Sequence, residues 1–193
     1  DDAAGTIQFG AATFSVNEDG VSATITVTRA NGTASGVTVD YTTSNGTATA
    51  GSDYTAARGT ITFGANETSK TFSVPIIDDT LDEANETVSL ALSNPTGGAT
   101  LGTPSTAVLT IIDNDDAGTV QFGAATFSIN EGGGSATITV TRANGAASGV
   151  TVNYATSNGT ATAGSDYTAA TGTITFGANE MSKSFSVPII DDL

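Results

Sequence analysis

The sequence predicts an all-β protein, an immunoglobulin-like antiparallel β-sandwich of about seven strands, present as a tandem repeat whose second copy is truncated. Polar and apolar residues alternate with a period of two over most of the chain, which is typical of half-buried strands. Turn-forming pairs such as Asn31-Gly32 separate these runs, and no stretch keeps a helical period. A long internal duplication completes the pattern.

The duplication defines the domains. Residues 5–80 match residues 118–193 without a gap, with 11 differences in 76 positions. The period exceeds the roughly 20–50 residues of a solenoid unit and fits one small domain. We therefore expect a complete domain over residues 4–116 and a partial second domain over residues 117–193 that lacks its last two strands. The chain would then be cut from a longer array, with the end of an earlier repeat at its start.

Seven strands are expected in the first repeat. The first, Thr6–Val16, has a kink at Gly10. The others cover Ser22–Arg29, Gly36–Thr43, Gly59–Gly64, Lys70–Ile77, Glu86–Ser93 and Thr106–Ile112. Their inward positions predict a core of Phe9, Phe14, Val16, Ile25, Val27, Val39, Tyr41, Ile61, Phe63, Phe72, Val74, Ile76, Val88, Leu90, Leu92 and Ile111. Thr and Ser occupy most outward positions, as the β-propensity of Thr predicts.

Truncation of the second repeat leaves an edge without a partner. We expect apolar residues such as Val152 and Tyr154 to be exposed there. Open edges recruit strands from other chains, so strand exchange through the truncated repeat is expected.

Composition excludes several classes of function. The chain has 20 acidic and 5 basic residues, a net charge of −15, which disfavours nucleic acid as a partner. The absence of His and Cys excludes Ser-His-Asp and Cys-His nucleophiles, thiolate or imidazole zinc sites and disulfides. No apolar run is long enough for a membrane span, so no direct membrane insertion is expected. We do not expect an enzyme.

The acidic residues gather where strands end. Glu18 follows the first strand, Asp53 lies in the loop after the third, and Asp78-Asp79 follow the fifth. Glu83 and Glu86 come next, and a further acidic run, Asp113–Asp116, follows the last strand. The loops after strands three, five and seven of a sandwich share one end, so these groups should converge.

Converging carboxylates need a cation that five basic residues cannot supply. Oxygen-only ligands at variable spacing favour Ca²⁺, which takes 6–8 oxygens, over Mg²⁺, which prefers a strict octahedron. Two alternatives remain: a solvated acidic rim, and a catalytic carboxylate pair.

The motifs of the first repeat resemble the Calx-beta domain, the calcium-binding module of sodium/calcium exchangers, integrin beta-4 and many bacterial surface proteins. The resemblance rests on GTATAGSDY, on IIDD followed by Glu83 and Glu86, and on the closing TIIDND. It implies the calcium ligands Glu18, Asp53, Asp78, Asp79, Glu83, Glu86, Asp113 and Asp115. It also implies a weaker, partial site at Glu131, Asp166, Asp191 and Asp192. Asn114 departs from the pattern, since the family's strong binders have an acid there.

The function expected from these features is a calcium-binding structural or adhesive repeat of a large extracellular protein of bacterial origin. Calcium would stiffen the junction between neighbouring repeats. The alternative is a regulatory calcium sensor of a transporter or signalling protein. A glycan-binding role also stays open.

Overall fold

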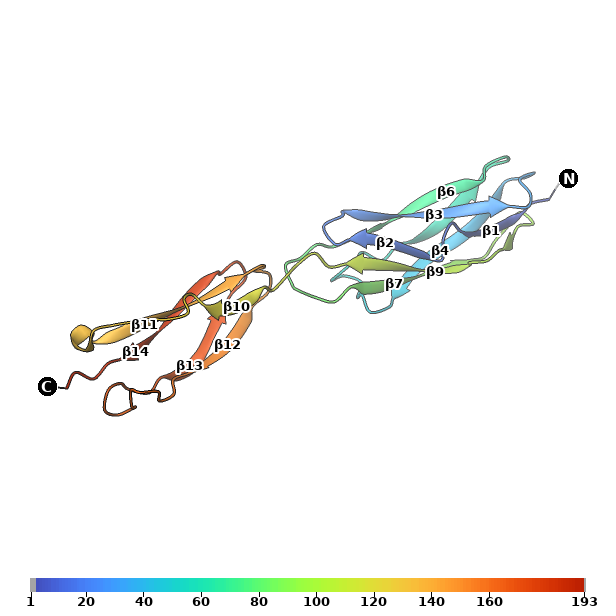
Figure 1. Ribbon diagram of the computed structural model, residues 1–193. Coiled ribbons are helices and arrows are strands. Elements are labelled where there is room, and N and C mark those ends of the chain that lie inside the picture. The colour runs from blue at the N-terminus through green and yellow to red at the C-terminus, as the bar shows by residue number, and fades with distance from the viewer. Residues whose placement is uncertain (1–2, 193) are drawn as a thin grey trace. The chain divides into compact units, whose positions relative to one another are not determined.

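The computed structural model describes residues 3–192, so Asp1, Asp2 and Leu193 lie outside the described part of the chain. The chain forms two compact units (Figure 1). Unit 1 comprises residues 3–79 and 83–114, and unit 2 comprises residues 80–82 and 115–192. Among the described residues, no helix has the length and apolar character needed to cross a bilayer.

Unit 1 is a sandwich of two sheets, as the alternating pattern predicts. A four-stranded sheet has the order β6 (Ser69–Pro75), β3 (Ser22–Ala30), β1 (Thr6–Phe9) and β8 (Thr100–Leu101). A five-stranded sheet has the order β2 (Thr13–Asn17), β9 (Thr106–Ile112), β7 (Glu86–Ser93), β4 (Val37–Asn45) and β5 (Arg58–Phe63). The side chains between the sheets make one core, in which the rings of Tyr41 and Phe72 stack 3.9 Å apart.

The first predicted strand is divided between the two sheets. Its first half, β1, pairs antiparallel with β3, and its second half, β2, pairs parallel with β9. The change of sheet follows Gly10, whose N–H donates to the carbonyl of Thr26 at 2.8 Å. A Cβ at Gly10 would come within 3.2 Å of the Thr26 side chain, so glycine permits this close approach. The sandwich therefore contains parallel pairs that an all-antiparallel arrangement does not predict.

The predicted core is buried, with three exceptions. Phe14, Val16 and Tyr41 are half-buried and pack against the cluster from its margin. The prediction missed seven members of the core, namely Ile7, Ala23, Val37, Ala48, Ala99, Ala107 and Leu109. Ala48 and Ala99 lie outside the strands, where the alternation of side chains makes no prediction, whereas the other five lie within strands and on the inward face.

Unit 2 repeats part of this arrangement. One sheet has the order β10 (Thr119–Phe122), β11 (Ser135–Ala143) and β14 (Ser182–Pro188), and β12 (Val150–Ala155) pairs with β13 (Thr171–Phe176). A short 3₁₀ helix, η1, covers Glu131–Gly133. The registers of β10 with β11 and of β11 with β14 equal those of β1 with β3 and β3 with β6, shifted by the repeat length.

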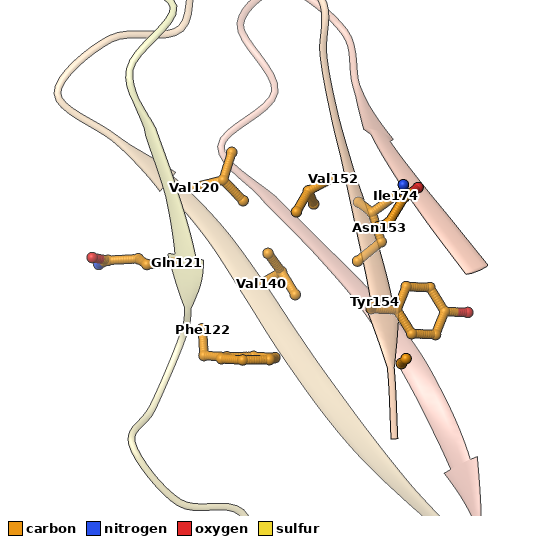
Figure 2. Close-up of a pocket in the computed structure, with 9 residues that line it drawn as sticks. Val120, Gln121, Phe122, Val140, Val152, Asn153, Tyr154 and Ile174 are labelled. Atoms are coloured by element: carbon orange, nitrogen blue, oxygen red, sulfur yellow. The ribbon is translucent and has the colours of Figure 1, made fainter. Parts of the chain in front are cut away.

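The expected exposure in unit 2 falls on different residues from those predicted. Val152 and Tyr154 are half-buried, because Val152 lines a cavity (Figure 2) and the Tyr154 ring stacks on Phe185 at 3.9 Å. Phe122 is the most exposed aromatic side chain among the described residues, at 61%. Residues 126–130 form no strand, although their counterpart in unit 1 is β2.

Candidate metal centre

Parallel pairing of β2 and β9 creates the first half of the site. Asn17 and Ile112 are paired at the ends of these strands, and the N–H of Glu18 donates to the carbonyl of Ile112 at 2.9 Å. Because both strands run in the same direction, the residues that follow them emerge side by side. Glu18 follows β2 and Asp113 follows β9, so the pairing brings two distant acids together.

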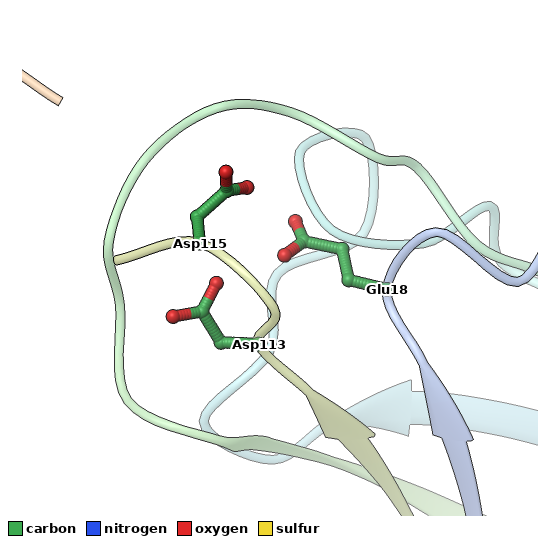
Figure 3. Close-up of side chains that lie close together, drawn as sticks. All are labelled: Glu18, Asp113 and Asp115. Atoms are coloured by element: carbon green, nitrogen blue, oxygen red, sulfur yellow. The ribbon is translucent and has the colours of Figure 1, made fainter. Parts of the chain in front are cut away.

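Three carboxylates make the first acidic group, which consists of Glu18, Asp113 and Asp115. Each offers an oxygen, and these oxygens lie within 4.8 Å of one another. The Glu18 carboxylate points toward the two aspartates, which come from the segment after β9 (Figure 3). Two oxygens bound to one calcium ion at about 2.4 Å lie at most about 4.8 Å apart, so these separations are compatible with a shared ion.

A second acidic group consists of Asp53, Glu83 and Glu86, with oxygens within the same 4.8 Å limit. Asp53 lies in the loop after β4, and its Oδ2 accepts a hydrogen bond from the N–H of Thr49 at 2.6 Å. Glu86 is the first residue of β7, and Glu83 precedes it by three residues. The group therefore joins a loop to the start of a central strand.

Asp113 connects the two acidic groups. Its Oδ2 accepts the N–H of Glu83 at 3.0 Å, and its own N–H donates to Oδ1 of Asn85 at 3.1 Å. Five carboxylates of unit 1 thus gather at one of its ends, and the sixth, Asp115, follows Asn114, the last residue of that unit.

Similarity to known sequences assigns the chain to a family. The sequence model of the Calx-beta domain matches residues 1–115 and 113–193, which together cover the chain. The chain belongs to the Calx-beta domain family.

This Calx-beta chain is similar to parts of sodium/calcium exchangers. The sodium/calcium exchanger Calx of Drosophila melanogaster is 34% identical over 154 residues, covering 80% of this chain and 16% of that protein. Sodium/calcium exchanger 1 of Canis lupus familiaris is 36% identical over 174 residues, covering 81% and 18%. The crystal structure of the calcium binding domain CBD12 of CALX1.1 superposes with a TM-score of 0.59 at 32% identity, covering 97% of this chain and 76% of that one. The chain spans less than a fifth of the length of the two exchangers.

Burial and mutual repulsion raise the pKa values of several acids of the Calx-beta site. Desolvation, followed by the charge of Asp79, raises the pKa of Glu18 from 4.5 to about 7. Desolvation, followed by a hydrogen bond with Asp53, raises the pKa of Glu86 to about 7 as well. The pKa of Glu83 is also raised, first by desolvation and then by the charge of Asp79. The raised pKa values of these three glutamates indicate that no neighbouring positive charge neutralises them.

Four of the five basic residues are engaged elsewhere, and the fifth, Arg58, is exposed at the start of β5. Lys70 pairs with Glu67 at 2.8 Å and Lys183 with Glu180 at 2.7 Å, and neither glutamate belongs to an acidic group. The buried guanidinium of Arg29 donates to the carbonyls of Ala4 and Gly64, and Arg142 is buried in the same way in unit 2. A cation from solvent is therefore the available counter-charge.

Two of the eight ligands expected in the first repeat lie outside the acidic groups. Asp79 is half-buried and close enough to raise the pKa of Glu18, to which its N–H also donates. Asp78 is exposed. Asn114, the departure from the family pattern, uses its Oδ1 to accept the N–H of Asp19 at 3.3 Å and so holds the loop after β2.

The four expected ligands of unit 2 are more loosely arranged. Asp166 repeats the hydrogen bond of Asp53, with its Oδ2 accepting the N–H of Thr162 at 2.6 Å. Glu131 begins η1, and its hydrogen bond with Asp192 and the charge of that residue raise its pKa. The two three-carboxylate groups found among residues 3–192 include none of Glu131, Asp166, Asp191 and Asp192.

Sequence reasoning missed the asparagines that shape the site. Oδ1 of Asn45 accepts both the Tyr54 hydroxyl at 2.8 Å and the N–H of Ala50 at 3.0 Å, which fixes the loop that carries Asp53. Asn158 makes the equivalent bonds in unit 2. The residue type is the signal that could have indicated this role, because an Asn side chain beside a turn commonly makes hydrogen bonds to nearby backbone groups.

The raised pKa values predict how stability depends on pH in chelator. The folded protein holds protons on Glu18 and Glu86 up to about pH 7, whereas the unfolded chain releases them near pH 4.5. The unfolding free energy should therefore fall as pH rises from 5 to 7, by about 2 kcal/mol per carboxyl. The lowered pKa values of Asp40, Glu67 and Glu180 act below this window. Denaturant titrations at several pH values test this, and a flat profile would contradict it.

Proposed function

We propose that the two acidic groups bind Ca²⁺ and that the chain serves as a regulatory calcium sensor in a transporter or signalling protein. The observation that carries the proposal is the gathering of six carboxylates in two groups of three, each with oxygens within 4.8 Å of one another. The family match and the likeness to sodium/calcium exchangers and to a calcium binding domain support it.

The origin of the ligands supports sensing over mere retention of an ion. They come from the segments after β2, after β4, before β7 and after β9. Without a cation these acids repel one another, and with a cation bound they are attracted to the ion. Binding would therefore order four segments at once, and would stabilise the folded unit by mass action.

The expected adhesive and extracellular role finds no support in the named relatives, which are sodium/calcium exchangers of animals. Stiffening of a junction between repeats by calcium stays a prediction. The regulatory alternative agrees better with those relatives. That the protein containing this chain is a transporter is part of the proposal.

Calorimetry on the full chain tests calcium binding and its coupling to protons. At pH 7, calcium should displace protons from Glu18 and Glu86, so the measured heat should change with the ionisation enthalpy of the buffer. Affinity should fall between pH 8 and pH 6, by about tenfold for each carboxyl that must ionise. Magnesium, which tolerates irregular oxygen sites poorly, should bind more weakly. No heat at millimolar calcium would favour a solvated acidic rim.

A further inference from the structure

The ladder between β7 and β9 ends at the acidic groups. Its last pair joins Glu86 to Ile111, so Asp113 lies beside the residues that precede β7. Beyond that pair, side chains replace backbone carbonyls as acceptors. The N–H of Asp113 donates to Oδ1 of Asn85 at 3.1 Å, and Oδ2 of Asp113 accepts the N–H of Glu83 at 3.0 Å. We call these two hydrogen bonds the Asp113 clamp.

The Asp113 clamp joins the two acidic groups through a residue that belongs to neither. Asp113 is a member of the first group and Glu83 of the second. Asn85 lies between Glu83 and Glu86 in the sequence. A carboxylate oxygen has two lone pairs, so Asp113 can accept the Glu83 N–H and still offer an oxygen to a metal ion. Movement of either segment therefore displaces acids of both groups.

An amide at position 85 supplies position without charge. Asn85 is exposed, and its Oδ1 accepts the Asp113 N–H without adding to the six carboxylates of the two groups. An acid at this position would accept the same hydrogen bond but would add repulsion. An apolar side chain would add no charge but would remove the acceptor.

We propose that Asn85 is a positioning residue for the calcium ligands, which couples the two acidic groups by fixing Asp113 against the segment before β7. The inference rests on the proposed function and concerns how the same site responds to calcium. Ordering residues 83–86 and the segment after β9 costs conformational entropy. Because the Asp113 clamp ties these segments together, acids that become ordered in one group also order part of the other. The second binding event then meets a smaller ordering cost.

Charge and position have opposite effects on this second binding event. Two divalent cations repel each other, so charge alone weakens the second event and spreads binding over a wider range of calcium concentration. A shared ordering cost strengthens the second event and narrows that range. The steepness of a calcium titration therefore separates positioning by Asn85 from a general loss of structure, which lowers affinity without removing the coupling.

The variants Asn85→Ala and Asn85→Asp test the proposal on the full chain. In chelator, the Asp113 amide of Asn85→Ala should exchange with solvent at least about tenfold faster than in the unsubstituted chain, because its N–H loses its acceptor. In calorimetry at pH 8, calcium should bind Asn85→Ala about tenfold more weakly and with a less steep titration. Asn85→Asp keeps an acceptor oxygen, so it should retain the slow exchange and the steep titration.

The matched control is Asn153→Ala. Asn153 is an exposed asparagine of β12 outside both acidic groups, and its Oδ1 accepts the hydroxyl of Thr173 at 2.7 Å. Its substitution should leave the Asp113 exchange and the calcium titration unchanged.

Two results would overturn this inference alone. One is a calcium titration of Asn85→Ala that equals that of the unsubstituted chain in affinity and steepness. The other is an Asn85→Asp variant that behaves like Asn85→Ala, because the acceptor oxygen would then not matter. Failure of the unsubstituted chain to bind calcium would overturn the proposed function, and this inference with it.

Discussion

In chelator at pH 7.5, the double variant Glu18→Gln, Glu86→Gln should be more stable than the unsubstituted chain, and in calcium the order should reverse. Both carboxyls have a pKa of about 7 instead of 4.5, so ionising them costs folding free energy in the absence of a cation. A neutral amide removes about 3 kcal/mol of that cost at each position. Loss of two carboxylate ligands should abolish the gain from calcium, because each acidic group loses one of its three acids. Thermal unfolding with and without calcium measures both signs.

Glu131→Gln is the matched control, because Glu131 is the counterpart of Glu18 in unit 2. It lies in neither three-carboxylate group, so its substitution should leave calcium stabilisation of unit 1 unchanged. A double variant that is less stable than the unsubstituted chain under both conditions would contradict the account, since Glu18 and Glu86 would then contribute structure instead of repulsion.

The sequence predicted the convergence of the acids but not the geometry of each one. Strand order alone places the segments after β4, β6 and β9 at one end of a sandwich. The contact of Glu18 with Asp113 depends on the parallel pairing of β2 with β9, which alternation does not reveal. Asp78 and Asp79 illustrate a second limit. Adjacent residues of an extended segment point to opposite sides, and the sequence does not say which one turns toward the site. Asp79 does so, and Asp78 is exposed.

The fold shows the same limit at β2. Thr13–Asn17 and residues 126–130 differ only at Val16, which is Ile129, yet the first segment is a strand and the second is not. β2 pairs only with β9, and unit 2 presents no counterpart of β9 among its described residues. Local propensity is the same in both copies, so the pairing partner decides the conformation.

Substitution of Phe9 and of Phe122 should lower stability by different amounts. They occupy equivalent positions, and each makes a T-shaped contact with the next phenylalanine, at 6.3 Å with Phe14 and at 6.5 Å with Phe127. Phe9 is 1% exposed, whereas Phe122 is 61% exposed. Phe9→Ala should lower the stability of unit 1 by about 3–5 kcal/mol, because it leaves a cavity under β7 and β9. Phe122→Ala should cost unit 2 less than about 1 kcal/mol.

Native-state hydrogen exchange separates the two effects, because it reports each unit through its own amides. β3 pairs with β1 and reports Phe9→Ala, while β11 pairs with β10 and reports Phe122→Ala. Since the aromatic contact is the same in both units, a large difference between the variants must come from burial beneath the covering strands. Equal losses would show that the aromatic pair itself stabilises each unit.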